Sequence, residues 1–118
     1  MFQSCKALTE IVIPDSVTAI GDYCFNLDDK LASVKIGSGV TSIGEYAFYG
    51  CSSLTNIEFA EKSSLTTLGK GTFASTGFAA FTVPQGVTDI GENCFDSAAS
   101  LAAVSIPDSV THVGSNAF

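Results

Sequence analysis

One stretch of 13 residues, repeated along the chain, most constrains what this sequence can fold into. IPDSVTAIGDYCF at residues 13–25 returns as IPDSVTHVGSNAF at residues 106–118, and three looser copies lie between them, at residues 36–48, 59–73 and 83–95. Self-similarity with a period of about 20 to 50 residues is typical of repeat arrays, in which each unit packs only against its neighbours. The chain is therefore predicted to be a repeat solenoid of about five repeats, each of about 23 residues.

Each repeat contains one glycine at the same place, and these glycines set the register. Successive glycines are separated by 23, 25, 22 and 23 residues. The longer spacing comes from two extra residues within residues 60–64, and the shorter one from a residue missing within residues 74–77. Both segments consist of polar or small residues, where a solenoid tolerates changes of length. The register glycines are Gly21, Gly44, Gly69, Gly91 and Gly114.

Two short strands are predicted in each repeat. The pattern L-x-x-I-x-I predicts a strand with one buried face, and in the first repeat it runs from Leu8 to Ile13. A turn residue such as Pro14 follows and ends the strand, because proline lacks the backbone donor. The motif Val-Thr-x-Ile, at residues 17–20 in the first repeat, then predicts a second short extended segment.

The rest of each repeat is expected to turn the chain back. We expect the register glycine to adopt a backbone conformation that a side chain would resist. The x-x-small-Phe motif that follows is expected to form a single helical or 3₁₀ turn. One coil cannot enclose its own apolar residues, so they are buried only when coils stack. The repeated phenylalanine predicts an aromatic ladder in the core, interpreted as packing rather than as a ligand site: Phe25, Phe48, Phe73, Phe95 and Phe118.

The aligned repeats read L-x-x-[IV]-x-I-P-x-S-V-T-x-I-G-x-x-A-F, which resembles the BspA-like (bacterial surface antigen type) leucine-rich repeat. The resemblance covers the whole chain and is least regular in the middle repeat, where LTTLG at residues 65–69 replaces the usual motif. It implies a right-handed coil, mainly β, with short parallel strands. It also implies that residues 1–118 are a single leucine-rich-repeat domain, which we expect to be a piece of a longer array.

The resemblance also implies a functional class. Similar proteins are secreted or surface-anchored and act in adhesion, so it implies an extracellular or cell-surface location and a protein partner such as a host matrix or cell-surface protein. The expected function is a non-catalytic protein-interaction or adhesion module, and the alternative is a structural spacer with no ligand of its own. The resemblance supplies no set of ligand-binding residues.

Composition argues against nucleic acid as a partner. The five basic residues are all lysine and the net charge is -7, so a phosphate backbone would be repelled and arginine contacts to bases are not available. No apolar run approaches the roughly 20 residues of a membrane span. The first residues, Met-Phe-Gln-Ser-Cys, show no signal peptide.

No constellation of residues predicts catalysis, a metal or a cofactor. Cysteines that share a column, Cys24 with Cys94 and Cys5 with Cys51, are expected to lie at least about 9 Å apart at the spacing of stacked strands. A disulfide needs Cα atoms within about 7 Å, so we interpret these cysteines as small buried residues. No C-x-x-C motif occurs and His112 is the single histidine, which argues against a zinc site. His112 is expected to face solvent, and no serine or cysteine is placed by the repeat to pair with it, which argues against nucleophilic catalysis. Residues 26–29 supply only part of a calcium loop.

Two surfaces are candidates for binding a partner. The first is the outward face of the longer strands, where charges concentrate in the first half; its residues are Glu10, Val12, Ser33, Lys35, Asn56, Glu58, Thr82 and Ser105. The alternative is a patch of tyrosine, a residue preferred at interfaces: Tyr23, Tyr46 and Tyr49. If the chain is a spacer, both surfaces are merely solvated.

The two ends of the array predict a third kind of contact. No polar capping repeat is visible at either terminus, and a bare coil exposes apolar side chains and unpaired strand edges. We therefore expect end-to-end self-association, through a head-to-tail or two-fold contact, unless further repeats cover the ends.

Overall fold

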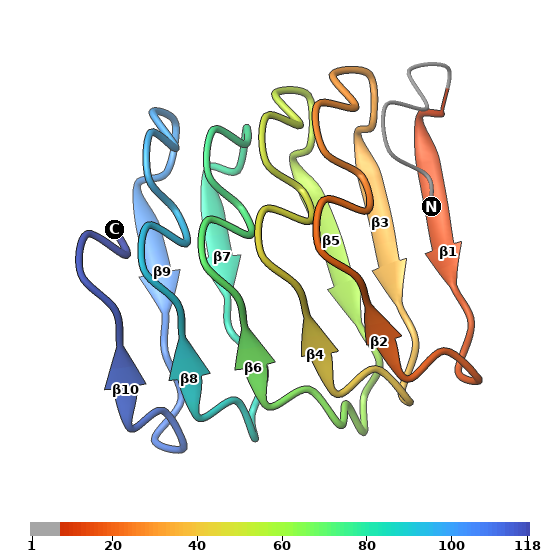
Figure 1. The fold of residues 1–118 in the computed structure, drawn as a ribbon, viewed down its shortest axis with the longest axis vertical. Coiled ribbons are helices and arrows are strands. Elements are labelled where there is room, and N and C mark those ends of the chain that lie inside the picture. The colour runs from red at the N-terminus through yellow and green to blue at the C-terminus, as the bar shows by residue number, and fades with distance from the viewer. Residues whose placement is uncertain (1–7) are drawn as a thin grey trace.

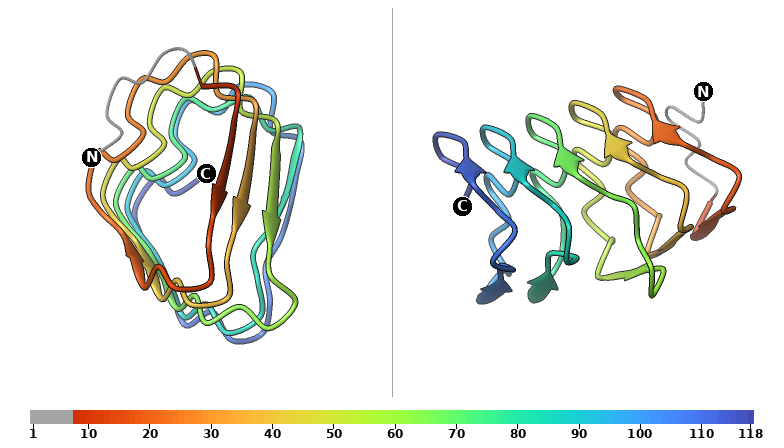
Figure 2. Two further views of the ribbon diagram at one scale, coloured as in Figure 1. Left: turned by 90° about the vertical axis from the view of Figure 1, so that its right-hand side faces the viewer. Right: turned by 90° about the horizontal axis from the view of Figure 1, so that it is seen from below.

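The computed structural model of the chain describes residues 8–118, which form a β-solenoid of about five coils. Each coil has one longer and one shorter strand, and every strand pair is parallel. Figure 2 shows the coils stacked one behind another. The predicted fold class is confirmed. The longer strands are β1 (Glu10–Ile13), β3 (Ser33–Ile36), β5 (Asn56–Phe59), β7 (Ala80–Thr82) and β9 (Ala103–Ser105). The shorter strands are β2 (Ala19–Ile20), β4 (Ser42–Ile43), β6 (Thr67–Leu68), β8 (Asp89–Ile90) and β10 (His112–Val113).

The alternation of apolar and polar residues places the longer strands with one face on the core. In β3, Val34 and Ile36 are buried while Lys35 between them is exposed. Equivalent residues of successive coils lie opposite one another, as Val34 does with Ile57. Each coil therefore buries its apolar positions against the same positions of its neighbours, as expected for a solenoid.

The shorter strands form one continuous sheet, the short-strand sheet, in the order β10-β8-β6-β4-β2. A column of threonines runs along its outer surface and ties each coil to the one before. The Thr41 hydroxyl donates to the carbonyl of Thr18 at 3.0 Å, and the Thr66 hydroxyl to that of Thr41 at 3.1 Å. This explains why threonine follows the valine in the repeat motif.

The longer strands form the long-strand sheet, which is interrupted once. Strands β1, β3 and β5 pair with one another and β7 pairs with β9, but β5 and β7 are not paired. The interruption lies between the two irregular spacings of the sequence, the short segment at residues 74–77 and the long one at residues 60–64. The long-strand sheet is thus two sheets, of three and two strands.

The predicted aromatic ladder forms the centre of the core. Successive phenylalanine rings stack with centroid distances of 5.2, 5.5, 5.6 and 5.4 Å along the series Phe25, Phe48, Phe73, Phe95 and Phe118. Their interplanar angles are 18° or less. The first four rings are fully buried, so the interpretation as packing is confirmed.

The expected helical or 3₁₀ turn before each phenylalanine is wrong, because residues 8–118 contain no helix. Instead the chain makes successive turns, with Tyr23 in the left-handed conformation at φ 59°. This geometry points alternate N–H groups at the next coil, so Tyr23 donates to Glu45 at 2.9 Å and Phe25 to Ala47 at 2.8 Å. The N–H groups between these donate within the coil, as Cys24 does to Gly21 at 3.4 Å and Asn26 to Tyr23 at 3.2 Å. Because bonds within the coil alternate with bonds to the next coil, the continuous run of bonds that a helix needs does not form. None of residues 8–118 belongs to a helix with the length and hydropathy of a membrane span.

The reason expected for the register glycine is also wrong. None of the five register glycines has a positive φ. A side chain is excluded by the neighbouring coil instead: a Cβ at Gly69 would lie 2.8 Å from the carbonyl carbon of Gly44 and 2.8 Å from the amide nitrogen of Glu45. At Gly21 a Cβ would meet nothing within 4 Å. At the register glycines of the second to fifth coils, close stacking against the preceding backbone therefore selects glycine, rather than local conformation.

Candidate binding surfaces

The predicted sheet face points outward, but it is divided. Strand register places Glu10, Ser33 and Asn56 side by side in one column, and Val12, Lys35 and Glu58 in the other. Thr82 and Ser105 lie opposite each other on the β7–β9 pair, beyond the interruption. The structure thus brings the first six residues together and leaves the last two on a separate sheet.

The larger part of this face combines one apolar side chain with charges. Val12 is 70% exposed and lies opposite Lys35, which in turn lies opposite Glu58. In the other column Asn56 Nδ2 donates to Ser33 Oγ at 3.3 Å. Such cross-strand neighbours interact with one another. Some of the polar side chains of this face are therefore paired within the face.

The three predicted tyrosines lie together in the turns that follow β2 and β4, in the first two coils. Tyr23 and Tyr46 stack at a centroid distance of 5.5 Å, and Tyr46 meets Tyr49 edge-on at 5.6 Å. Tyr23 is 44% and Tyr49 37% exposed. Leu27, which the sequence analysis did not single out, adjoins them through its N–H bond to the carbonyl of Tyr49 and is 46% exposed. These four residues are called the tyrosine patch below.

The backbone of the tyrosine patch is strained. Tyr23, Leu27 and Tyr46 have φ of 59°, 62° and 55°, a conformation that costs a residue with a bulky side chain about 1–2 kcal/mol. In the column of Tyr23 and Tyr46, the third, fourth and fifth coils carry Gly71, Asn93 and Asn116. In the column of Leu27, the second, third and fourth coils carry Gly50, Ser75 and Ser97. Leu27 is identified by comparing the residues of its column once the left-handed φ of that column is known. The first coil thus carries a tyrosine or leucine in both columns, the second coil in one, and the later coils in neither.

Carboxylates border the tyrosine patch. Asp22 and Glu45 precede Tyr23 and Tyr46 in the chain, and both are exposed. The N–H of Glu45 donates to Asp22 Oδ1 at 2.8 Å, which fixes the Asp22 side chain beside the patch. The surface is therefore aromatic with an acidic margin.

The described cysteines have free thiols that act as small core residues. Burial raises the pKa of both Cys51 and Cys94 to about 12. Cys51 Sγ also donates to the carbonyl of Phe25 at 3.2 Å. Both thiols are therefore protonated at neutral pH and poor nucleophiles. Cys24 is half-buried, and Cys5 lies outside the described residues.

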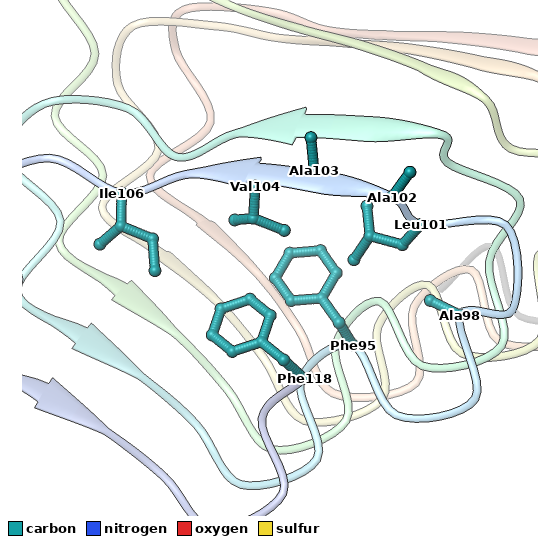
Figure 3. Close-up of a pocket in the computed structure, with 8 residues that line it drawn as sticks. All are labelled: Phe95, Ala98, Leu101, Ala102, Ala103, Val104, Ile106 and Phe118. Atoms are coloured by element: carbon teal, nitrogen blue, oxygen red, sulfur yellow. The ribbon is translucent and has the colours of Figure 1, made fainter.

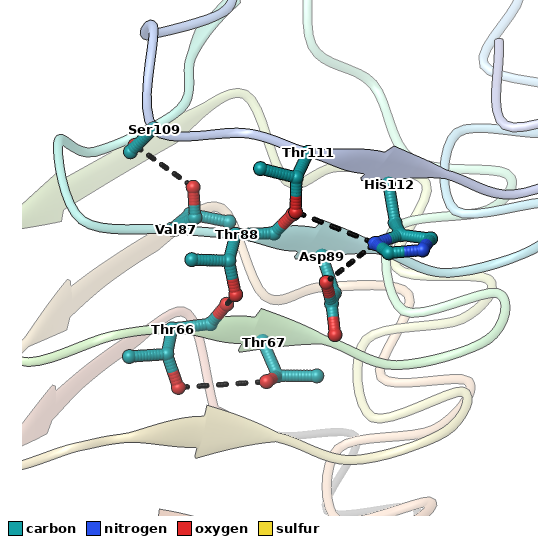
Figure 4. A network of polar contacts seen from close by, with 8 residues as sticks. All are labelled: Thr66, Thr67, Val87, Thr88, Asp89, Ser109, Thr111 and His112. Atoms are coloured by element: carbon teal, nitrogen blue, oxygen red, sulfur yellow. Dashed lines mark hydrogen bonds and ion pairs between the residues drawn. The ribbon is translucent and has the colours of Figure 1, made fainter.

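The histidine lies on the outer surface of the short-strand sheet, as expected (Figure 4). His112 Nδ1 is 3.5 Å from Asp89 Oδ1 on the neighbouring strand and 3.3 Å from the Thr111 hydroxyl. Both side chains of the pair are largely exposed, and an exposed pair stabilises a fold little. His112 is thus linked through Thr111 to the column of threonines that connects the coils.

The remaining acids do not assemble into a metal site within the described part of the chain. Across residues 8–118 no group of three or more His, Cys, Asp and Glu side chains is placed to hold a metal ion. In the partial calcium loop, Asp28 is buried and Asp29 exposed, so the two carboxylates face different surroundings.

The last coil carries an apolar hollow of about 320 Å³ (Figure 3). It is lined by rings and aliphatic side chains that include Phe95, Val104, Ile106 and Phe118. Phe118 stacks on Phe95 with one face and is 54% exposed. The apolar coil surface expected at this end is present, and self-association through it stays a prediction.

Comparisons with known proteins agree with this fold. A family model described as "BspA type Leucine rich repeat region (6 copies)" matches residues 1–118. The search of curated proteins found no match. A leucine-rich repeat protein from Bacteroides ovatus is 37% identical, with a TM-score of 0.86 over 97% of this chain and 29% of that one.

Two further solved structures are similar. The T. pallidum leucine-rich repeat protein is 30% identical, with a TM-score of 0.85 over 93% of this chain and 53% of that one. A leucine-rich cell surface protein from Faecalibacterium prausnitzii is 26% identical, with a TM-score of 0.60 over 94% of this chain and 45% of that one. The chain thus spans between 29% and 53% of the length of these three proteins.

Proposed function

Because the chain belongs to the BspA type leucine-rich repeat family, we propose that it is a non-catalytic protein-interaction module of an extracellular or cell-surface protein. A similar structure is described as a cell surface protein, which supports this location. The buried, protonated thiols and the solvent-facing histidine give no support to an enzymatic role. The finer role within this class is adhesion, with a host matrix or cell-surface protein as the partner.

The tyrosine patch is the observation that carries the proposal. Tyrosine is enriched at protein interfaces, because its ring supplies contact area at little cost in conformational entropy. Here two tyrosines and a leucine are exposed together, and three of the four patch residues adopt a backbone conformation that Asn or Gly adopts at lower cost. Strain of this kind is often concentrated at binding sites. We therefore assign partner binding first to this patch.

The outward face of β1, β3 and β5 is the second candidate surface. Val12 offers apolar contact area there, with Lys35 and Glu58 beside it. An interface on this face would depend on charge, so salt would weaken it. An interface on the tyrosine patch would respond to salt much less.

A binding experiment with two variants tests the proposal. The purified chain is passed over immobilised matrix and plasma proteins in a surface plasmon resonance panel, together with a Tyr23→Asn/Tyr46→Asn double variant. Asparagine occupies the same column at positions 93 and 116, so the double variant is expected to lose at least about tenfold in affinity with no loss of melting temperature. The matched control, Lys35→Glu/Glu58→Lys, changes the sheet face and is expected to bind normally.

Other results would redirect the proposal. Loss of binding in the control alone would move the site to the sheet face. Absence of saturable binding to every protein of the panel would favour the spacer.

A further inference from the structure

The interruption of the long-strand sheet leaves a space between β5 and β7, which we call the sheet gap. At one end the Gly77 N–H donates to the Leu54 carbonyl at 3.0 Å, and at the other the Thr88 N–H donates to the Thr66 carbonyl at 2.9 Å. Between these bonds every Cα of β5 is more than 8 Å from every Cα of β7. Paired strands lie about 4.8 Å apart. Figure 1 shows this wider separation.

Backbone donors and acceptors face the sheet gap from both sides. The N–H group of Asn56 in β5 and that of Ala60, directly after the strand, donate back to the preceding coil, at 3.3 and 3.0 Å. Successive residues of a strand point their N–H and C=O groups in opposite directions, so Ile57 and Phe59 direct theirs into the gap. On the other side Val83 donates to Ser105 at 2.9 Å. By the same alternation Ala80 and Thr82 direct theirs into the gap.

Burial indicates that the sheet gap is open to solvent. Val34 and Ile36 in the second coil are 1% exposed, whereas Ile57 and Phe59 in the same columns of the third coil are only half-buried. A hollow of about 520 Å³ opens at the end of the gap. It is lined by Phe59, Ala60, Glu61, Lys62, Ser63, Thr82, Pro84 and Gln85.

Large side chains hold the sheet gap open. Three positions that carry leucine, isoleucine or valine in other coils carry phenylalanine here: Phe59, Phe78 and Phe81. Phe81 meets Phe59 at a centroid distance of 6.0 Å, Phe73 at 5.0 Å and Phe95 at 4.9 Å. The extra rings fill the core between the third and fourth coils, so these coils cannot approach as closely on this side. The gap is therefore a built feature of the fold.

We propose that the sheet gap binds one extended peptide segment of a partner protein, which adds as a strand between β5 and β7. Two strand spacings of about 4.8 Å require about 9.6 Å between the flanking strands, which agrees with the separation beyond 8 Å. An added strand satisfies both rows of backbone groups at once, as in other complexes formed by strand addition. This site is separate from the tyrosine patch, and neither depends on the other.

The surroundings of the sheet gap define the chemistry of the peptide. Its inward side chains would cover Ile57 and Phe59, which favours β-branched or other apolar residues at alternate positions. Its outward side chains would lie beside Glu58, with Glu61 at the mouth of the gap. A basic residue is favoured there, because Lys35 already occupies the equivalent place on the other side of Glu58. Proline is disfavoured because it lacks a donor.

A peptide copied from this chain provides the probe. LASVKIGS, residues 31–38, contains β3, which is paired on both sides in the structure and has the required alternation and lysine. The peptide is expected to bind the intact protein in a calorimetric titration. Methylating the backbone nitrogens equivalent to Val34 and Ile36 is expected to weaken binding at least about tenfold, because each methyl removes a donor.

Amide exchange followed by NMR locates the site. In the free protein the amides of Ile57, Phe59, Ala80 and Thr82 are expected to exchange at least about tenfold faster than that of Val34, and the peptide is expected to slow them. The Thr82→Pro variant lacks one donor of the gap and is expected to lose binding, while Thr82→Ala keeps it. Slow exchange of the four amides in the free protein would overturn the proposal. It would equally be overturned if the peptide protected only amides of β9 and β10, or if Thr82→Pro or the methylated peptide bound normally.

Discussion

The short-strand and long-strand sheets run through the same coils, yet only the short-strand sheet is continuous. On the short-strand side, the register glycines bring successive backbones almost into contact, and threonine hydroxyls bond to the neighbouring carbonyls. On the long-strand side, the distance between coils depends on the side chains that fill the core, and three extra phenylalanines keep two coils apart. Coil spacing is thus fixed by backbone contact on one side and by side-chain volume on the other.

Removing the central ring of the aromatic ladder tests the side-chain half of this comparison and has the largest expected effect. Phe73 is fully buried and contacts the rings of Phe48, Phe81 and Phe95. Phe73→Ala is expected to lower the free energy of unfolding by about 3–5 kcal/mol in urea denaturation. Phe118→Ala, at the half-exposed end of the ladder, is expected to cost less than half as much. Equal losses would show that ladder position does not matter.

Adding a methyl group to the glycine column tests the backbone half. Gly69→Ala places a Cβ against the backbone of the preceding coil and is expected to cost about 1–3 kcal/mol. Gly21→Ala is the matched control, since its Cβ meets nothing within 4 Å and its φ is not positive. The control is expected to leave stability unchanged or to raise it slightly. Thermal denaturation of both variants measures the difference, and similar losses would contradict selection by coil contact.

The buried thiols sharpen the comparison by reporting whether the core beside the aromatic ladder stays dry. Burial raises the pKa of Cys94 from 9.0 to about 12, so the folded state favours the protonated thiol. Stability is therefore expected to be retained below pH 9 and to fall between about pH 9 and 12, by up to about 1.4 kcal/mol per pH unit for this thiol. Cys94→Ala, which matches Ala47 and Ala117 of the same column, is expected to flatten this fall. An unchanged pH profile in the variant would indicate that solvent reaches the thiol.

The threonine column gives the smallest effect. Thr88→Val removes the bond from the Thr88 hydroxyl to the Thr66 carbonyl at 3.3 Å but keeps the N–H bond to the same carbonyl at 2.9 Å. Because the carbonyl keeps one donor, the expected loss is about 0.5–1 kcal/mol. Thr82→Val, at an exposed position of β7, is the control and is expected to be neutral. A neutral Thr88→Val would show that the backbone bonds alone hold the short-strand sheet.

The sequence predicted what the repeat pattern controls directly. Alternating residues such as Val34, Lys35 and Ile36 identify the strands, and the recurring phenylalanine identifies the core. The left-handed turns were not predicted, because Tyr23 and Leu27 are residues that rarely adopt that conformation. Their φ is imposed by hydrogen bonds to the next coil, which no single repeat encodes.

The sheet gap was not predicted either, although its causes were visible in the sequence. The two changes of repeat length and the bulky Phe81 could each be found by alignment. Whether these changes interrupt the short-strand sheet, the long-strand sheet, both or neither depends on how neighbouring coils pack together. Of the candidate surfaces, the outward face and the three tyrosines could be located from the repeat register, whereas Leu27 required the backbone conformation to be known.

The bonds between coils also decide how the molecule responds to force. They run along the solenoid axis, so tension between the two ends loads the coils one after another rather than all at once. Each released coil would lengthen the chain by about 80 Å, the extended span of its roughly 23 residues. The weakest link is the junction of the third and fourth coils, where only one of the two strand ladders is present. Single-molecule stretching should therefore show stepwise extension that starts at this junction. The chain would then lengthen in several steps under tension instead of unfolding in one event.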